Sequence, residues 1–170
     1  MKFFSEATNY LWVKIALGVM VVALAWRAGP TRRVAVQALL AFPISDGLTN
    51  ALKHLWPMPR PFQDLPQGEF ILRVGLSPSA GTASAHSANM AVVAFIFIYH
   101  LGWRGFPWAL VALLTGLSRV YNAAHYPYQV LFGWFCGICV GFVVTAVGNL
   151  ILMRRANVHT VESDVENEPT

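Results

Sequence analysis

The chain is short of charge. Lys, Arg, Asp and Glu make up 12% of its 170 residues, about half of the roughly 25% that is usual in globular domains. Acidic residues number only 8, and the formal net charge is +4. The basic residues are scattered among apolar runs and form no stripe with interleaved aromatics, which argues against a nucleic-acid-binding protein. A single domain in a membrane, with an anionic ligand, explains this composition better.

Cysteine is also scarce. Cys136 and Cys139, the two in the chain, have the C-x-x-C spacing that thioredoxin-type redox motifs share. They lie within residues 131–153, an almost uninterrupted apolar run. Such a pair is more often a pair of small packing residues than a redox or metal-binding group. The sequence therefore favours neither a redox centre nor a metal site here.

Long apolar runs, by contrast, are abundant. A membrane-spanning helix needs about 20 mostly apolar residues, and five segments are candidates. The segment at residues 33–56 is the least hydrophobic of the five, because it carries Asp46, Asn50 and Lys53. The predicted fold is all-α, a polytopic membrane bundle of about five transmembrane helices. The candidate helices are residues 8–26, 33–56, 84–101, 107–124 and 127–153.

The predicted membrane-embedded domain comprises residues 1–153. Its first helix is interpreted as retained, because no convincing cleavage site precedes Arg27; a cleaved signal is the alternative. A loop rich in Pro and Gly, residues 57–83, follows the second helix and is expected to hold a short helix near residues 68–74. The polar residues 154–170 are predicted to form a disordered tail.

The distribution of Lys and Arg predicts the orientation. Most arginines fall between the first and second helices, between the third and fourth, and after the fifth. In a chain of five membrane helices these three places lie on the same side of the membrane, which the positive-inside rule makes cytoplasmic. Lys53, Arg60 and Arg119 fall on the outer side, against the rule, and so invite a functional explanation. The arginines that set the orientation are Arg27, Arg32, Arg33, Arg104, Arg154 and Arg155.

Three polar stretches lie on that outer side: residues 53–61, 82–86 and 118–129. Because successive helices alternate in direction, all three reach one membrane level. A phosphate group is the ligand that best fits them. Arg60 and Arg119 can each offer a forked pair of N–H donors, and Lys53 adds a point charge.

Helix termini and histidines complete the predicted site. Ser84 lies where the third helix begins, so free N–H groups and the positive end of the helix dipole face the ligand. One of His86 and His125 could attack phosphorus while the other protonates the departing oxygen. Gln129 follows His125 by four residues and can accept its Nδ1–H, which fixes the tautomer.

The ordered pattern K-x6-RP, S-x-H and SR-x5-H-x3-[D/Q] resembles that of the type 2 phosphatidic acid phosphatase (PAP2) superfamily and covers residues 53–129. The resemblance implies a PAP2-like core, a phosphohistidine intermediate, and neither metal nor cofactor. It makes His125 the nucleophile, His86 the general acid and Gln129 the group that orients the nucleophile. The implied phosphate-binding residues are Lys53, Arg60, Ser84, Ala85 through its N–H, Ser118 and Arg119.

Two positions depart from the usual family pattern. Ala83-Ser84-Ala85-His86 replaces Pro-Ser-Gly-His, which keeps the backbone donor but restricts φ. Gln129 replaces the usual Asp; it can accept the Nδ1–H but cannot stabilise an imidazolium by charge. The glucose-6-phosphatase branch of the superfamily also has Gln there, so we expect a working enzyme.

The resemblance implies a lipid phosphatase on the extracytoplasmic face of a bacterial cytoplasmic membrane. A polyprenyl pyrophosphate is favoured as substrate, with phosphatidylglycerol phosphate, phosphatidic acid and lipid A as further candidates. The alternatives are a phosphatase of a soluble sugar phosphate and a non-catalytic protein that binds phospholipid headgroups.

Several residues have two interpretations. Gly133, Gly137 and Gly141 favour close helix packing within one chain, with a homodimer interface as the alternative. Asp46 and Asn50 could support Lys53 or Arg60, or simply join helices. His54, His100 and His159 match no block and are interpreted as structural.

Overall fold

The computed structural model describes residues 29–66, 68–71, 73, 75 and 77–166, together with the single residues 19, 23 and 26. Within these residues all regular structure is helical, so the predicted all-α class is confirmed. The predicted helix at residues 8–26 lies almost wholly outside the described part. The elements are α3 (Pro30–Leu55), α4 (Pro61–Asp64), α5 (Ala85–Leu101), the 3₁₀ helix η2 (Gly102–Gly105), α6 (Phe106–Tyr121) and α7 (Pro127–Glu166).

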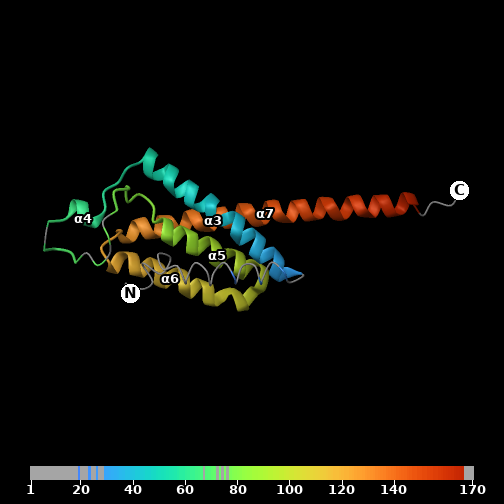
Figure 1. Cartoon of the computed structure of the whole chain (residues 1–170), viewed down its shortest axis with the longest axis horizontal. Coiled ribbons are helices and arrows are strands. Elements are labelled where there is room, and N and C mark those ends of the chain that lie inside the picture. The colour runs from blue at the N-terminus through green and yellow to red at the C-terminus, as the bar shows by residue number, and fades with distance from the viewer. Residues whose placement is uncertain are drawn as a thin grey trace.

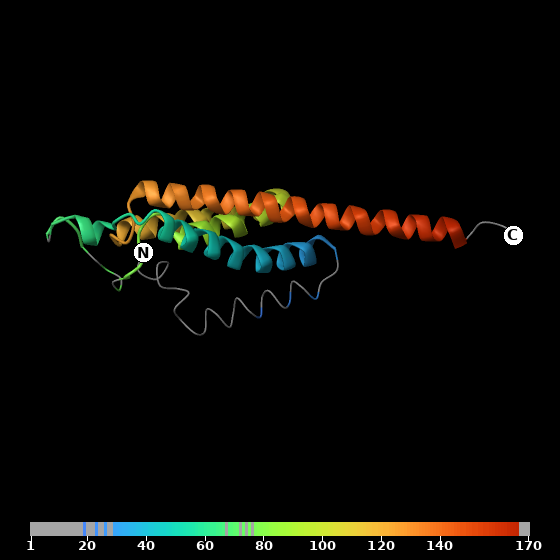
Figure 2. The ribbon, with the colours of Figure 1, turned by 90° about the horizontal axis from the view of Figure 1, so that it is seen from above.

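In the described part of the chain, the long helices α3, α6 and α7 pack around α5, which runs antiparallel to α3 and α6 and parallel to α7 (Figures 1 and 2). Helix α5 contacts α3, α6 and α7, because apolar residues cover most of its circumference. Its Val92 and Ile96 are fully buried and pack with Val34, Ala41 and Val140 from α3 and α7. The end of α3, the start of α5 and the α6–α7 junction consequently meet at one end of the bundle.

Glycines on α7 allow that helix to approach α5 closely. A Cβ atom at Gly133 would lie 2.6 Å from the Ser84 carbonyl oxygen, and one at Gly137 would lie 2.2 Å from the Ala88 carbonyl oxygen. Both distances are too short for any side chain. The glycine face is therefore used within the chain, as the sequence favoured, and this motif gives no support to a dimer interface.

The outer surface of the bundle is apolar. Large hydrophobic side chains such as Leu113, Phe135 and Phe142 are exposed on α6 and α7, as expected for helices that face lipid. Among the described residues, two stretches are long and apolar enough to cross a membrane, Ala85–Tyr121 and Pro127–Arg155. The first comprises α5, η2 and α6, whereas α3 carries four charged residues. The predicted count of five membrane helices is therefore not confirmed.

Two local features differ from the sequence-based expectation. Helix α7 continues to Glu166, so residues 154–166 are helical here, since neither Gly nor Pro interrupts them. The helix predicted near residues 68–74 is wrong for the described residues of that stretch, where Gly68 adopts a φ of 104°. Helix α4 forms earlier, because Pro61 suits a first helical position and the Arg60 N–H donates to Gln63 Oε1 at 3.0 Å.

Candidate active site

Three chain segments are joined by backbone hydrogen bonds at the end of the bundle where α5 begins. The Gly81 N–H donates to the Met58 carbonyl at 2.7 Å, and the Ser84 N–H donates to the Gln129 carbonyl at 3.1 Å. The Thr82 hydroxyl accepts the Met58 N–H at 3.2 Å and also donates to the Trp56 carbonyl. The three polar stretches identified in the sequence therefore lie side by side.

A tight turn after α6 positions His125. The Ala124 N–H donates to the Arg119 carbonyl at 3.0 Å, and the Ala123 N–H donates to the Val120 carbonyl at 2.9 Å. This is the Schellman arrangement, which usually has glycine at its left-handed residue. Here Ala123 adopts that conformation, with a φ of 54°, at a cost of about 1–2 kcal/mol. The surrounding packing holds a strained residue two positions before the predicted nucleophile.

The His125 ring is 3% exposed and has a defined orientation. Its Nδ1 lies 3.1 Å from both the Gly81 carbonyl oxygen and Gln129 Oε1. Both neighbours are acceptors, so Nδ1 carries the proton and Nε2 keeps its lone pair. Burial, followed by the charges of Arg60 and Arg119, lowers the pKa of His125 to about 3. The imidazole is therefore neutral at physiological pH, which is the nucleophilic form.

Both the oxygen and the nitrogen of the Gln129 side-chain amide form hydrogen bonds. It is fully buried, and its Oε1 accepts from His125 Nδ1 and from the Tyr126 N–H at 3.2 Å. Its Nε2 donates to the Pro59 carbonyl at 2.9 Å. A carboxylate could replace only the accepting half of this arrangement. The neutral residue at this position therefore connects His125 to the segment that carries Arg60.

Arg60 is 4% exposed and lies at the centre of the site. Its Nε donates to the Ser79 carbonyl at 2.8 Å, and Nη2 donates to the Ser79 hydroxyl at 2.8 Å and to the Ala80 carbonyl at 3.3 Å. Its Nη1 faces the Ala124 carbonyl and His125 Nε2, each at 3.3 Å. The guanidinium therefore fixes the position of two loops and places one N–H beside Nε2 of His125.

The start of α5 supplies the second predicted histidine. Ser84 caps this helix, and its buried hydroxyl oxygen accepts the Ser87 N–H at 3.4 Å and the Ser87 hydroxyl at 2.9 Å. Ala85 and His86 follow in the first turn and are half-buried. The charges of Arg119, Lys53 and Arg60 act on His86. His86 therefore lies in the first turn of α5, where the charges of these three cations and of Asp46 reach it.

The last turn of α6 contains two further predicted residues. Arg119 is buried and lies one turn before the Schellman turn, whose N–H groups its carbonyl accepts. Ser118 is also buried, but its hydroxyl donates to the Thr115 carbonyl at 2.7 Å. Direct phosphate binding by Ser118 stays a prediction, because its proton points into its own helix.

A chain of polar side chains supports Lys53. Its Nζ donates to Asn50 Oδ1 at 3.3 Å, and Asn50 Nδ2 donates to Asp46 Oδ2 at 3.3 Å. The other Asp46 oxygen accepts from Asn89 Nδ2 on α5, also at 3.3 Å. Both interpretations of Asp46 therefore hold, since it joins α3 to α5 and supports Lys53 through Asn50.

Sequence reasoning missed the residues that hold the long loop. A Cβ atom at Gly81 would lie 2.8 Å from the Gln129 amide and 2.9 Å from Arg60 Cγ, so only glycine fits there. The Tyr126 hydroxyl donates to Asp64 Oδ2 at 3.0 Å. The Arg73 guanidinium lies 4.4 Å from the centre of the Tyr121 ring. Gly81, three residues before Ser84, was the one signal in the sequence that could have indicated this close packing. The other two contacts join residues far apart in the chain.

The family model of the PAP2 superfamily matches residues 34–151. The chain belongs to the PAP2 superfamily. All nine predicted site residues lie within the matched range. Together with the apolar helices, PAP2 membership identifies an integral membrane protein.

Two known PAP2-related proteins resemble this chain. It is 28% identical over 133 residues to the bacitracin transport permease protein BcrC of Bacillus licheniformis, covering 76% of this chain and 63% of that protein. The chain thus spans somewhat less than two thirds of that relative. Its fold matches the crystal structure of a transmembrane PAP2 type phosphatidylglycerolphosphate phosphatase from Bacillus subtilis, with a TM-score of 0.65 and 24% identity. That match covers 88% of this chain and 76% of the other, and at this identity it shows the fold.

Proposed function

We propose that this PAP2 protein is a membrane phosphatase that hydrolyses a lipid phosphate monoester or diphosphate. The observation that carries the proposal is the setting of His125. The ring is buried and neutral, its proton is held on Nδ1, and its Nε2 faces an Arg60 N–H at 3.3 Å. Binding of a headgroup alone needs cations but does not need an imidazole in this arrangement.

The first step transfers the phosphoryl group to the enzyme. A phosphate oxygen that replaces Nε2 as the acceptor of Arg60 brings phosphorus beside the nitrogen lone pair. The Nε2–P bond forms while the bond from phosphorus to the leaving oxygen breaks, and His86 gives its proton to that oxygen. Arg60, Arg119, Lys53 and the backbone N–H of Ala85 stabilise the charge that develops on the phosphoryl oxygens.

The second step releases phosphate. Water attacks the phosphohistidine, His86 takes up its proton, and the Nε2–P bond returns its electron pair to His125. The net reaction consumes one water and yields the dephosphorylated lipid and inorganic phosphate. Gln129 and Gly81 hold the Nδ1–H throughout, so the ring does not rotate between the steps. The scheme uses no metal and no cofactor.

A lipid substrate fits a site at one end of apolar helices, since the tail can stay in the bilayer. The name of the Bacillus subtilis structure supports phosphatidylglycerol phosphate as a candidate. Polyprenyl pyrophosphate and phosphatidic acid are the other two. The proposed location is the extracytoplasmic face of a bacterial cytoplasmic membrane. A phosphatase of a soluble sugar phosphate and a non-catalytic headgroup-binding protein are the competing functions.

The decisive experiment measures phosphate release by the purified full chain in detergent, from each of the three lipid classes and from a soluble sugar phosphate. We expect His125→Ala to lower kcat by about a thousandfold or more. His100→Ala, which alters a histidine that pairs with Gln37 away from the site, is the matched control and should stay near the unmodified rate. Equal phosphate release by His125→Ala and the unmodified chain would refute the nucleophile assignment.

Two further experiments test whether the reaction is independent of metal ions and whether it passes through a phosphohistidine. Activity should be unchanged in EDTA, because the scheme relies on cationic side chains instead of a metal ion. Trapping with radiolabelled phosphate should give an acid-labile, base-stable phosphoprotein, as expected for phosphohistidine. Activity that EDTA abolishes and a divalent cation restores would exclude this mechanism.

A further inference from the structure

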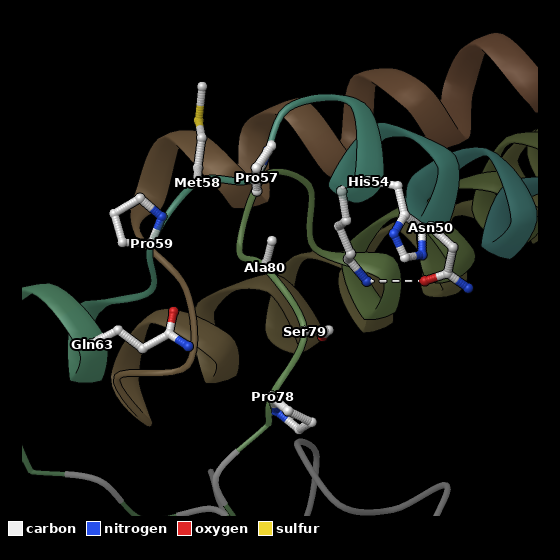
Figure 3. A pocket seen from close by; sticks show the side chains of 10 residues that line it. Asn50, His54, Pro57, Met58, Pro59, Gln63, Pro78, Ser79 and Ala80 are labelled. Carbon is white, nitrogen blue, oxygen red and sulfur yellow. Dashed lines mark hydrogen bonds between the residues drawn. The ribbon is translucent and has the colours of Figure 1, made fainter.

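A cavity of about 610 Å³ lies next to the proposed catalytic residues. The last turns of α3 form one wall, and the segments before Arg60 and around Ser79 form the others, as Figure 3 shows. Neither the general acid nor the nucleophile lines it. Lys53 belongs to both places, because it lines the cavity and is one of the phosphate-binding residues of the proposed mechanism.

The lining of this cavity suits an anion. Among the described residues that form it none is acidic, whereas Lys53, His54 and Gln63 are nitrogen donors. Gln63 Oε1 accepts the Arg60 N–H at 3.0 Å, which leaves its Nε2 as the group directed toward the cavity (Figure 3). Asn50 holds Lys53 in place through the 3.3 Å hydrogen bond. A negatively charged ligand would therefore meet three donors, Lys53 and His54 on α3 and Gln63 on α4.

Two features connect the cavity to the proposed site. The first is Lys53, which lines the cavity and is also one of the phosphate-binding residues of the proposed mechanism. The second is the wall at Ser79 and Ala80, which is the segment that Arg60 fixes with three hydrogen bonds. A substrate whose terminal phosphate contacts Arg60 therefore has Lys53, His54 and Gln63 in the neighbouring cavity.

We propose that this cavity is a second anion subsite, in which Lys53, His54 and Gln63 bind the inner phosphate of a lipid diphosphate. The inference rests on the proposed function and deepens it. His125 attacks the terminal phosphorus, and the bond from that phosphorus to the bridging oxygen breaks. The bridging oxygen takes the electron pair and the His86 proton, and it leaves as part of a lipid monophosphate. Water then releases the terminal group as inorganic phosphate.

The subsite gives a reason for a preference for diphosphate over monophosphate substrates. The leaving group of a diphosphate is itself an anion, and its charge grows as the bond breaks. Donors that already hold this anion in the bound substrate contribute mainly to binding, so their loss acts chiefly on KM. The alcohol that leaves from a monoester is neutral and gains little from the same donors. His54, interpreted from the sequence as structural, becomes a specificity-determining residue.

Two substrates with the same tail separate these cases: farnesyl diphosphate and farnesyl monophosphate, presented in detergent micelles. His54→Ala should lower kcat/KM for the diphosphate by about tenfold, mainly through KM, and change the value for the monophosphate by less than about twofold. His54→Lys should keep the preference for the diphosphate, and His54→Glu should reduce it more than His54→Ala. The control His100→Ala should change neither substrate.

Gln63→Glu is the second variant. It keeps an oxygen that accepts the Arg60 N–H but replaces the Nε2 donor by a second acceptor. We expect the same selective loss of diphosphate hydrolysis, and the monophosphate rate reports that the site is still folded.

The outcomes distinguish the two proposals. If the unmodified chain releases phosphate from neither farnesyl substrate nor the lipid classes above, the proposed function fails. If it hydrolyses both farnesyl substrates, but His54→Ala and Gln63→Glu lower both equally or leave both unchanged, the phosphatase stands and the subsite is refuted. Loss confined to the diphosphate supports the subsite.

Discussion

The two halves of the site differ in how tightly the protein holds them. The closed half, Arg60, His125 and Gln129, is buried, and hydrogen bonds to three chain segments fix its side chains. The open half, Asn50, Lys53 and His54 at the end of α3, is half-buried or exposed. Its hydrogen bonds run along a single helix until they reach Asp46.

The difference corresponds to two tasks. Chemistry on phosphorus needs groups held within a fraction of an ångström, and burial strengthens their electrostatic effect on the transition state. Recognition of the rest of the substrate needs space and accessible donors. We therefore expect mutations in the closed half to lower kcat and those in the open half to change KM and substrate preference.

Among the residues that surround His125, Arg60→Lys should have the largest effect. Lysine keeps the charge but lacks the planar fork of five N–H donors, so the carbonyls of Ser79, Ala80 and Ala124 lose partners. We expect kcat/KM to fall by about a hundredfold or more, and the free energy of unfolding to fall by roughly 2 kcal/mol. Enzyme assays and thermal unfolding measure the two quantities.

Arg104→Lys is the control for that change. Arg104 lies exposed on η2 at the other end of the bundle, so the same replacement there should leave both quantities close to the unmodified values. If Arg60→Lys behaves like Arg104→Lys, the closed half is less rigid than its hydrogen bonds indicate.

Gln129 gives the next largest effect, and its variants separate orientation from charge. Gln129→Leu removes both ends of the amide and should lower kcat by about tenfold to a hundredfold. Gln129→Glu keeps an acceptor for His125 but leaves the Pro59 carbonyl without its donor. We expect this variant to retain more activity than Gln129→Leu at neutral pH.

The pH dependence of kcat/KM tests how residue 129 acts on the ionisation of His125. The pKa of His125 is lowered to about 3, so protonation of the nucleophile should inactivate the free enzyme only in strong acid. A carboxylate beside Nδ1 favours the imidazolium and raises this pKa. The acid limb of Gln129→Glu should therefore lie at higher pH than that of the unmodified chain, with the same substrate. Superimposable acid limbs would show that residue 129 does not act on the ionisation of His125.

The smallest effect should come from Asn50→Ala in the open half. The change removes a partner of Lys53 but leaves its charge in place, so KM should rise by a few-fold with kcat nearly constant. Asn149→Ala is the matched control, because Asn149 pairs with Tyr99 away from the site. A fall in kcat as large as that of Gln129→Leu would show that the two halves do not differ in function.

The sequence predicted which residues gather at the site better than it predicted the contacts that hold them there. Lys53, Arg60, Ser84, His86, Arg119, His125 and Gln129 were found from spacing and residue type, and the structure places them at one end of the bundle. The short helix was misplaced, because Gly68 stops a helix while Arg60, Pro61 and Gln63 start one earlier. The continuation of α7 to Glu166 was also missed, since polar composition suggested disorder although no residue there interrupts a helix.

Local sequence therefore determined the helical class, the apolar surface and the identity of the reactive groups, because periodicity, composition and motif spacing are properties of short stretches. Only the tertiary structure decided how those groups are oriented. The Gly81 carbonyl beside His125, the Pro59 carbonyl that Gln129 binds and the cavity beside Lys53 all depend on contacts between residues far apart in the chain. Such contacts form when the helices pack, and no single stretch of sequence encodes them.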